Sequence, residues 1–267
     1  MGTRLFKLQN GTNMLASLAA VSFIMIFASF IGKDVAKQVE NWILVPVLGA
    51  AVMLSIIFAI RSGAKGSHGK AWILFSIAMV TWFIGEQVWF VYELVYNENP
   101  FPSLADFFYL TGYVFFFAFS FYYIKPVKKA VTKKIVGTAI AISAALLIPT
   151  VYYSLNSDYN SFELALAASY PILDVITLVP SLIGIALFLG GEVNFMWTLV
   201  MLGMAIFVMA DTGFLVANLA GEYYTGHPLD ILYLWSYLLF AFGVRDQMNI
   251  FRKNSEGERF NKQEELR

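Results

Sequence analysis

The sequence predicts an all-α polytopic membrane protein, in which eight transmembrane helices form two parallel four-helix repeats. Hydrophobic residues make up 59% of the 267 residues and charged residues 13%, against about 45–50% and about 25% in soluble domains. Apolar stretches of about 20 residues recur along the chain, and each is long enough to cross a hydrocarbon core of ~30 Å. Acidic residues also occupy matching contexts in the two halves of the chain, which indicates an internal duplication.

The apolar stretches define the expected helices in order. They cover residues 13–31, 41–60, 71–96, 105–124, 135–153, 171–190, 195–220 and 229–247. The third and seventh are long, so we expect them to tilt or to protrude. Residues 1–124 would form the first repeat, 125–247 the second, and 248–267 a charged tail on the cytoplasmic side. Little chain remains for a soluble domain.

The repeat is read from paired segments. WFIGEQVWF corresponds to IFVMADTGF, PFPSLADFFYLTGY to GHPLDILYLWSY, and ENWILVPVL to DVITLVPSL. The acidic pairs are Glu86 with Asp211, Asp106 with Asp230, and Glu40 with Asp174. The tyrosines Tyr109 and Tyr113 recur as Tyr233 and Tyr237. An even number of helices in each repeat would make the two repeats parallel, related by an axis along the membrane normal.

The basic residues predict the orientation. Eight spans place both termini on one side together with loops 61–70, 125–134 and 190–194, and 16 of the 18 Lys and Arg residues fall on that side. Because basic residues favour the cytoplasmic side, we expect a multi-pass cell-membrane protein with both termini in the cytoplasm. Topology and contact with anionic lipids account for this basic rim, so we predict no nucleic-acid partner.

The reactive residue types limit the chemistry. The chain has no cysteine and two histidines, His68 and His227, which lie on opposite sides. Disulfides, thiolate metal sites, paired histidine ligation of haem and zinc centres built on several histidines are therefore excluded. No nucleophile triad or phosphate-binding loop is present, so we expect no cofactor, no metal and no enzymatic activity.

Four acidic residues lie near predicted helix starts on the outer side: Glu40, Asp106, Asp174 and Asp230. Asp106 completes an S-x-x-D pattern with Ser103, which is typical of a capping box. Capping explains such positions because the positive end of a helix dipole favours a carboxylate. A ring of outer carboxylates that binds a cation or an amine is the alternative.

Glu86 and Asp211 lie deeper in their spans. Each falls about sixteen residues from the inner end, roughly 24 Å along the helix at ~1.5 Å per residue. No Lys or Arg lies at that depth. The two acids are either hydrogen-bonded packing groups between helices or the lining of a cavity that opens outward. Glu93, seven residues after Glu86, extends a polar stripe on the same helix face toward the outside.

The candidate hydrogen-bond partners of Glu86 and Asp211 are Gln87, Thr212, Asn218, Ser169 and the tyrosines that cluster in the outer third. These tyrosines are Tyr92, Tyr96, Tyr113, Tyr170, Tyr223, Tyr224 and Tyr237. An aromatic cage for an amine or a flat ligand is a further possibility for this cluster. The candidate ligand-binding residues are therefore Glu86, Glu93, Asp106, Asp174, Asp211, Asp230, Tyr113 and Tyr237.

The order of these segments resembles a family. G-E-x-x-W, N-P-F-P-S-L-A-D-F-F-Y-L-x-x-Y, Y-P-I-L-D, A-D and D-I-L-Y-L-x-x-Y follow one another over residues 15–245. This order is similar to the eight-helix membrane sensor region that precedes histidine kinase, diguanylate cyclase or phosphodiesterase domains in bacterial and archaeal signalling proteins. P-S-x-A-D-x-x-Y-L is its most specific part. The resemblance implies an input module with Glu86, Asp106, Asp174, Asp211 and Asp230 at recurrent acidic positions.

The chain departs from such proteins after residue 247, where a charged segment of about twenty residues takes the place of an output domain. We therefore expect a non-catalytic sensor-like or accessory module, which binds an unknown small ligand or partner from the outer side and contacts a membrane or cytoplasmic signalling partner inside. A transporter for a small molecule or cation that uses Glu86 and Asp211 is the alternative. A membrane enzyme acting on lipids is disfavoured, because acid–base chemistry by carboxylates usually needs a second reactive group.

Overall fold

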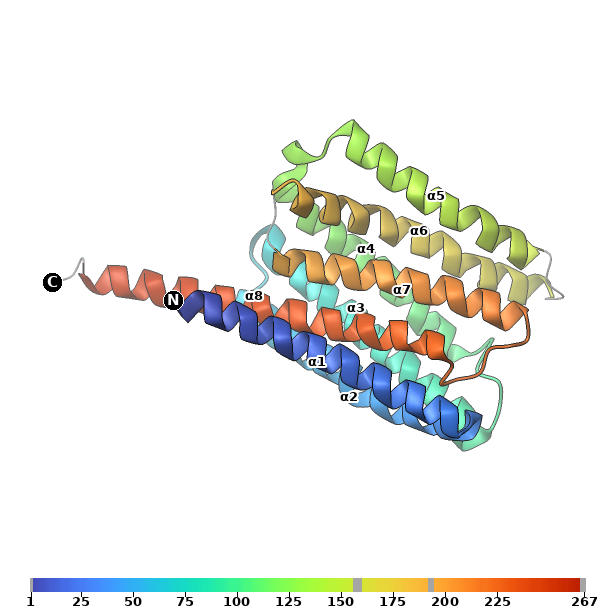
Figure 1. Ribbon diagram of the computed structural model, residues 1–267. Helices are drawn as coiled ribbons and strands as arrows, with labels where there is room; N and C mark the ends of the chain where they lie inside the picture. The colour runs from blue at the N-terminus through green and yellow to red at the C-terminus, as the bar shows by residue number, and fades with distance from the viewer. Residues whose placement is uncertain (1, 156–159, 192–194, 265–267) are drawn as a thin grey trace.

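The computed structural model describes the backbone of residues 2–155, 160–191 and 195–264. Within these ranges the chain is helical with short connections (Figure 1). The long helices are α1 (Gly2–Ile31), α2 (Lys33–Ser62), α3 (Gly66–Phe90), α4 (Leu104–Ile124), α5 (Lys133–Leu155), α6 (Ser161–Leu189), α7 (Phe195–Leu219) and α8 (Ile231–Glu264). Three short elements join them: the π-helical turn η1 (Val91–Tyr96) and the 3₁₀ helices η2 (Lys125–Ala130) and η3 (Pro228–Asp230).

Six of the helices form a closed circuit of neighbours. α2 packs on α3, α3 on α4, α4 on α6, α6 on α7, α7 on α8, and α8 returns to α2. α1 lies outside this circuit against α2 and α8, and α5 lies outside it against α6 and α7 (Figure 1). The bundle therefore has an interior that is bounded by helices from both halves of the chain.

The helices suit a membrane. Among the described residues, seven helices are long and apolar enough to cross one, namely α1 to α7, with η1 and η2 continuing α3 and α4. α8 is also long enough and packs on α1, α2 and α7, but Arg245 and Asp246 interrupt its apolar part. Large apolar side chains such as Phe23, Phe30 and Ile60 lie exposed on the bundle surface, where lipid would cover them. The chain is thus a multi-pass membrane protein by length and composition.

Several helices begin earlier than the apolar stretches predict, and α2 and α6 are the two for which this changes the role of an acidic residue. α2 starts at Lys33 and α6 at Ser161, so Glu40 and Asp174 lie turns inside their helices and do not cap them. The polar residues at the start of α6 concealed its first turns, which Asn160 caps by accepting hydrogen bonds from two backbone N–H groups. Pro171 lies inside α6, where the bundle tolerates its missing N–H group.

The expected cap at the start of α4 is confirmed. Ser103 accepts a hydrogen bond from the backbone N–H of Ala105, and the carboxylate of Asp106 accepts one from the backbone N–H of Ser103 at 2.7 Å. This reciprocal capping box fixes the direction in which the chain enters α4. It also fixes one oxygen of Asp106.

Aromatic side chains fill one half of the bundle interior. Trp72, Phe75, Phe116, Phe119 and Phe240 are fully buried, and we call them the aromatic plug. The ring centroids of Phe75 and Phe119 are 5.0 Å apart, and those of Phe116 and Phe240 are 5.7 Å apart. The plug residues of α3 and α4 lie in the halves of these helices that are remote from loop 97–103, and Phe240 of α8 packs against them. The bundle is therefore tightly packed on that side.

Candidate functional site

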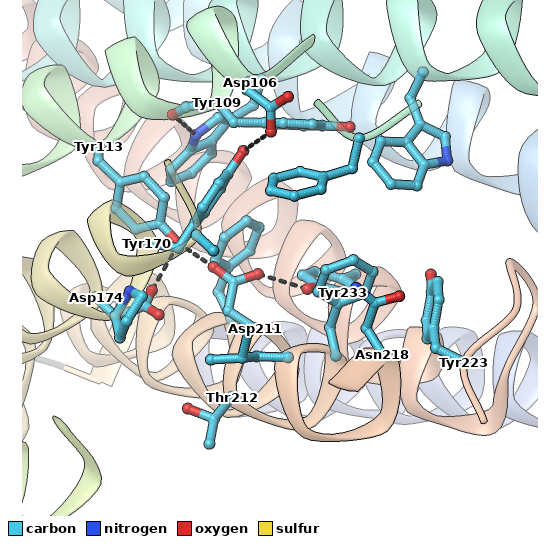
Figure 2. A pocket seen from close by; sticks show the side chains of 18 of the residues that line it. Asp106, Tyr109, Tyr113, Tyr170, Asp174, Asp211, Thr212, Asn218, Tyr223 and Tyr233 are labelled. Carbon is cyan, nitrogen blue, oxygen red and sulfur yellow. Dashed lines mark hydrogen bonds between the residues drawn. The ribbon is translucent and has the colours of Figure 1, made fainter. Parts of the chain in front are cut away.

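The other half of the bundle encloses a cavity of about 110 Å³, which we call the chamber. α3, α4, α6 and α7 supply most of its wall, and Figure 2 shows the side chains that project into it. Four carboxyl groups line it, those of Glu86, Asp106, Asp174 and Asp211. The aromatic lining consists of Trp82, Trp89, Phe101, Tyr109, Tyr113, Tyr170, Phe207, Phe214, Tyr223 and Tyr233. No Lys, Arg or His side chain is part of this lining.

Asp211 on α7 lies at the centre of the hydrogen-bonded network. Its Oδ1 accepts a hydrogen bond of 2.5 Å from the hydroxyl of Tyr233 on α8. Its Oδ2 accepts one from the hydroxyl of Tyr113 on α4 (Figure 2). Asp211 is thereby tied to the neighbouring helix α8 and, across the interior of the bundle, to α4.

Tyr113 links two acids. Its hydroxyl oxygen is 2.6 Å from Oδ1 of Asp174 on α6 while it also contacts Asp211. A phenol has a single proton to donate, so one of these two contacts needs a proton from a carboxyl group. Asp174 and Asp211 are also hydrogen-bonded to one another. Tyr113, Asp174 and Asp211 therefore share protons as one unit.

The two remaining acids of the chamber have their own tyrosines. Glu86 on α3 accepts a hydrogen bond of 3.0 Å from Tyr237 on α8, and a second one from Tyr109 on α4. Asp106 accepts one of 2.6 Å from Tyr170 on α6. Tyrosine hydroxyls thus donate to every carboxyl group of the chamber, and most of these bonds join different helices.

A wider hollow of about 650 Å³ adjoins the chamber at the end of the bundle formed by loop 97–103 and the α7–η3 connection. We call it the vestibule. Glu93 lies in its wall and accepts hydrogen bonds from Thr225 at 2.6 Å and from Asn41 at 3.0 Å. Lys37 Nζ lies 3.5 Å from the carboxylate of Glu93. Glu93 therefore fastens η1 to α2 and to the α7–η3 connection, which is a structural role.

The chamber and the vestibule share a narrow boundary. Trp89, Phe101, Phe214, Asn218 and Tyr223 line both. The rings of Phe214 and Tyr223 meet edge to face at 4.5 Å between centroids, and those of Trp89 and Phe214 at 6.3 Å. These five shared side chains, four of which are aromatic, lie between the two spaces, and we call them the aromatic constriction.

Asp230 and Tyr237 lie beside the chamber and are not in its lining. Asp230 accepts hydrogen bonds from the backbone N–H of Gly226 at 2.8 Å and from the hydroxyl of Tyr223 at 3.2 Å. Burial, followed by the nearby carboxylate of Asp230, raises the pKa of Tyr223 well above its ordinary value. Tyr223 accordingly stays a donor, and Asp230 holds it at the constriction.

The structure brings most of the predicted site residues together. Glu86, Asp106, Tyr113, Asp174 and Asp211 line the chamber, and tyrosines, which were among the candidate partners of Glu86 and Asp211, donate hydrogen bonds to both. Of the other partners considered for Glu86 and Asp211, Gln87 Nε2 is buried without a hydrogen bond. Trp89 and Phe214 at the constriction were missed, because the aromatic residues are so numerous that no pattern distinguishes these two.

Metal coordination has little support in the parts of the chain that the structure describes, where no group of three or more His, Cys, Asp or Glu side chains is arranged to hold an ion. Comparison with protein-family models, with curated proteins and with solved structures finds no match. The fold and the site define a multi-pass helical membrane protein with an acidic, aromatic chamber in one half of its bundle.

Proposed function

We propose that the protein is a non-catalytic membrane input module, which binds a small molecule from the outer side and relays its occupancy to a partner at the cytoplasmic end. The observation that carries this proposal is a chamber with one blind end. It adjoins the vestibule through the aromatic constriction, whereas the aromatic plug fills the bundle on its other side. A blind cavity suits binding and release at one surface.

The orientation is part of the proposal. Lys125, Lys128 and Lys129 of η2 lie at the end of the bundle remote from the vestibule, and the excess of basic residues at that end favours the cytoplasm. The vestibule then faces outward. The N-terminal end of α1 and the C-terminal part of α8, which lie on the same side of the bundle in Figure 1, then face the cytoplasm.

The repeat also supports this proposal. We infer two parallel four-helix repeats, because the contacts of α2 with α8, α2 with α3 and α3 with α4 correspond to those of α6 with α4, α6 with α7 and α7 with α8. The bonds between tyrosines and acids correspond in the same way, since Tyr113 donates to Asp211 and Tyr237 donates to Glu86. In each bond the tyrosine of one half meets the acid of the other. A ligand among these groups would change how the two halves contact each other.

A transporter remains the second candidate, since it too would place Glu86 and Asp211 around a ligand. It differs in one requirement, which is that the chamber must open at times to the cytoplasmic side. The plug residues would then have to separate. This requirement gives a direct test.

The test uses the absence of native cysteine from the chain. Thr212→Cys places a thiol in the chamber lining, Ser120→Cys places one at a fully buried position of α4 deeper in the bundle, and Lys129→Cys places one on exposed η2. Each variant is exposed to a membrane-impermeant thiol reagent, first on intact cells and then on inside-out vesicles.

An input module should be labelled at Thr212→Cys from the outside alone, at Lys129→Cys from the inside alone, and at Ser120→Cys from neither side. Labelling of Thr212→Cys from both sides would replace the input module by the transporter. Failure to label Thr212→Cys from the outside would refute the proposal that the chamber faces outward.

A further inference from the structure

We infer that the ligand of the chamber is a compact organic cation, a small primary or methylated amine, held by carboxylates and by the faces of aromatic rings. This inference rests on the proposed function, because it assigns a ligand class to the same outward-facing chamber. Four properties of the chamber support the inference: its volume, its charge, its free hydrogen-bond acceptors and its aromatic walls.

The volume of the chamber limits the ligand. An enclosed protein cavity of ~150 Å³ accommodates one benzene molecule. The chamber measures about 110 Å³ and so has room for roughly four or five non-hydrogen atoms. Simple amines such as isopropylammonium and tetramethylammonium are of this size. Nucleotides, sugars and peptides are too large.

The charge of the lining favours a cation. Four carboxyl groups face the chamber, and no Lys, Arg or His side chain lines it. The nearest salt bridge in the described structure, Lys37 with Glu93, lies in the vestibule. Among the described residues, no cationic side chain balances these carboxyl groups, so each one that loses its proton gives the lining an excess of negative charge. In a low-dielectric surrounding such an excess attracts a cation and repels an anion.

The tyrosine hydroxyl groups use their protons in bonds to the carboxyl groups, so carboxylate oxygens stay free as acceptors while few hydroxyl donors do. Tyr113, Tyr170 and Tyr233 each donate their hydroxyl proton to a carboxyl group of the lining. A carboxylate has about four lone-pair positions, and Asp174 Oδ2 takes part in no hydrogen bond with a tyrosine. The chamber therefore presents acceptor oxygens to its contents, which is what an N–H-bearing cation requires.

The walls favour an organic cation over a metal ion. Aromatic side chains from five helices line the chamber: Trp89 on α3, Tyr109 on α4, Tyr170 on α6, Phe214 on α7 and Tyr233 on α8 are among them. Aromatic rings attract ammonium groups through the negative potential of their faces. A bare metal ion would need several oxygen ligands in one shell, and the acids of the described chain form no such group.

The experiment measures charge selectivity at Thr212→Cys, with Asn99→Cys in the vestibule as the matched control. Two thiol-alkylating reagents small enough for the chamber are applied from the outside, 2-bromoethylammonium as the cation and bromoacetate as the anion. Because an acidic cleft concentrates cations by about tenfold or more, we expect the ratio of cationic to anionic labelling rates to be at least tenfold higher at Thr212→Cys than at Asn99→Cys. Glu86→Gln in the Thr212→Cys background should lower this ratio.

Competition by compounds that do not react with the thiol then tests the ligand class. Tetramethylammonium should slow the labelling of Thr212→Cys in a saturable manner and leave Asn99→Cys unaffected, while the neutral analogue tert-butanol should have no effect at equal concentration. Equal labelling rates for the two reagents, or equal protection by tert-butanol, would refute the inference that the ligand is a cation. The proposal of an outward-facing chamber would be unaffected. No outside labelling of Thr212→Cys by either reagent would overturn both proposals. If Glu86→Gln does not fold, Asp174→Asn removes charge from the same lining.

Discussion

Tyr113→Phe tests whether the hydroxyl of Tyr113 holds Asp174 and Asp211 together. The substitution keeps the ring, which packs edge to face on Trp82 and Phe207 at 5.7 and 6.1 Å between centroids. It removes one oxygen that contacts carboxyl groups on two helices. Any loss of stability is therefore a loss of hydrogen bonding and not of packing.

The magnitude follows from the number and type of bonds. Interhelical hydrogen bonds in membranes contribute ~0.6 kcal/mol on average, but bonds to charged groups contribute about 1.5–3 kcal/mol. Tyr113 has two such contacts, and without them Asp174 keeps only its contact with Asp211. We expect Tyr113→Phe to lower the free energy of unfolding by about 2–3 kcal/mol. Tyr237→Phe, which removes a single bond of 3.0 Å to Glu86, should cost about 1 kcal/mol.

The assay is reversible unfolding by titration of dodecyl sulfate into mixed micelles, followed by circular dichroism. Asp174→Asn in the Tyr113→Phe background supplies an amide donor to Asp211 and should recover about 1 kcal/mol. If Tyr113→Phe costs no more than Tyr237→Phe, Tyr113 does not bridge the two acids, and the shared-proton unit is wrong.

Three further outcomes are expected. Gly112→Ala should cost about 1–3 kcal/mol in the same assay, because the added methyl group would collide with the indole of Trp82 on α3. Gly137→Ala on α5, where no atom lies within 4 Å of the added methyl group, should stabilise slightly. Equal effects of the two substitutions would contradict the close α3–α4 packing. Ser103→Ala should cost about 1 kcal/mol through the lost cap of α4, and an unchanged midpoint would show that the capping box contributes nothing. Trp89→Leu should speed outside labelling of Thr212→Cys about fivefold by widening the constriction, and an unchanged rate would show that this ring does not limit entry.

The sequence was sufficient for the helices and for part of the site. Hydrophobic runs exceed the membrane thickness, so their number and approximate position follow from composition alone. The capping box at Ser103 was predictable because its signal lies within four residues. The start of α6 was not, because Asn160, Ser161 and Glu163 are polar enough to suggest a loop although they form a capped first turn.

The convergence of the acids was predictable only in part. Matching contexts indicated that Glu86 and Asp211 belong together, and the scarcity of Lys and Arg in the spans left uncharged polar side chains, the tyrosines among them, as their partners. Which tyrosine meets which acid depends on the α4–α6 and α2–α8 contacts, which join residues far apart in the chain. No local pattern contains that information, so the Tyr113–Asp174 bond, between residues 61 positions apart, came from the structure alone.

α8 has a mechanical consequence. Tyr233 and Tyr237 attach its first turns to Asp211 and Glu86, and the same helix continues without a proline to Glu264. Tyr237 and Glu264 are 27 positions apart, which corresponds to ~40 Å at ~1.5 Å per residue. An unbroken helix is stiff over that length, so a small twist imposed where the tyrosines are held would turn the far end by the same angle. α8 can thus transmit a rotation from the chamber to its C-terminal end at Glu264.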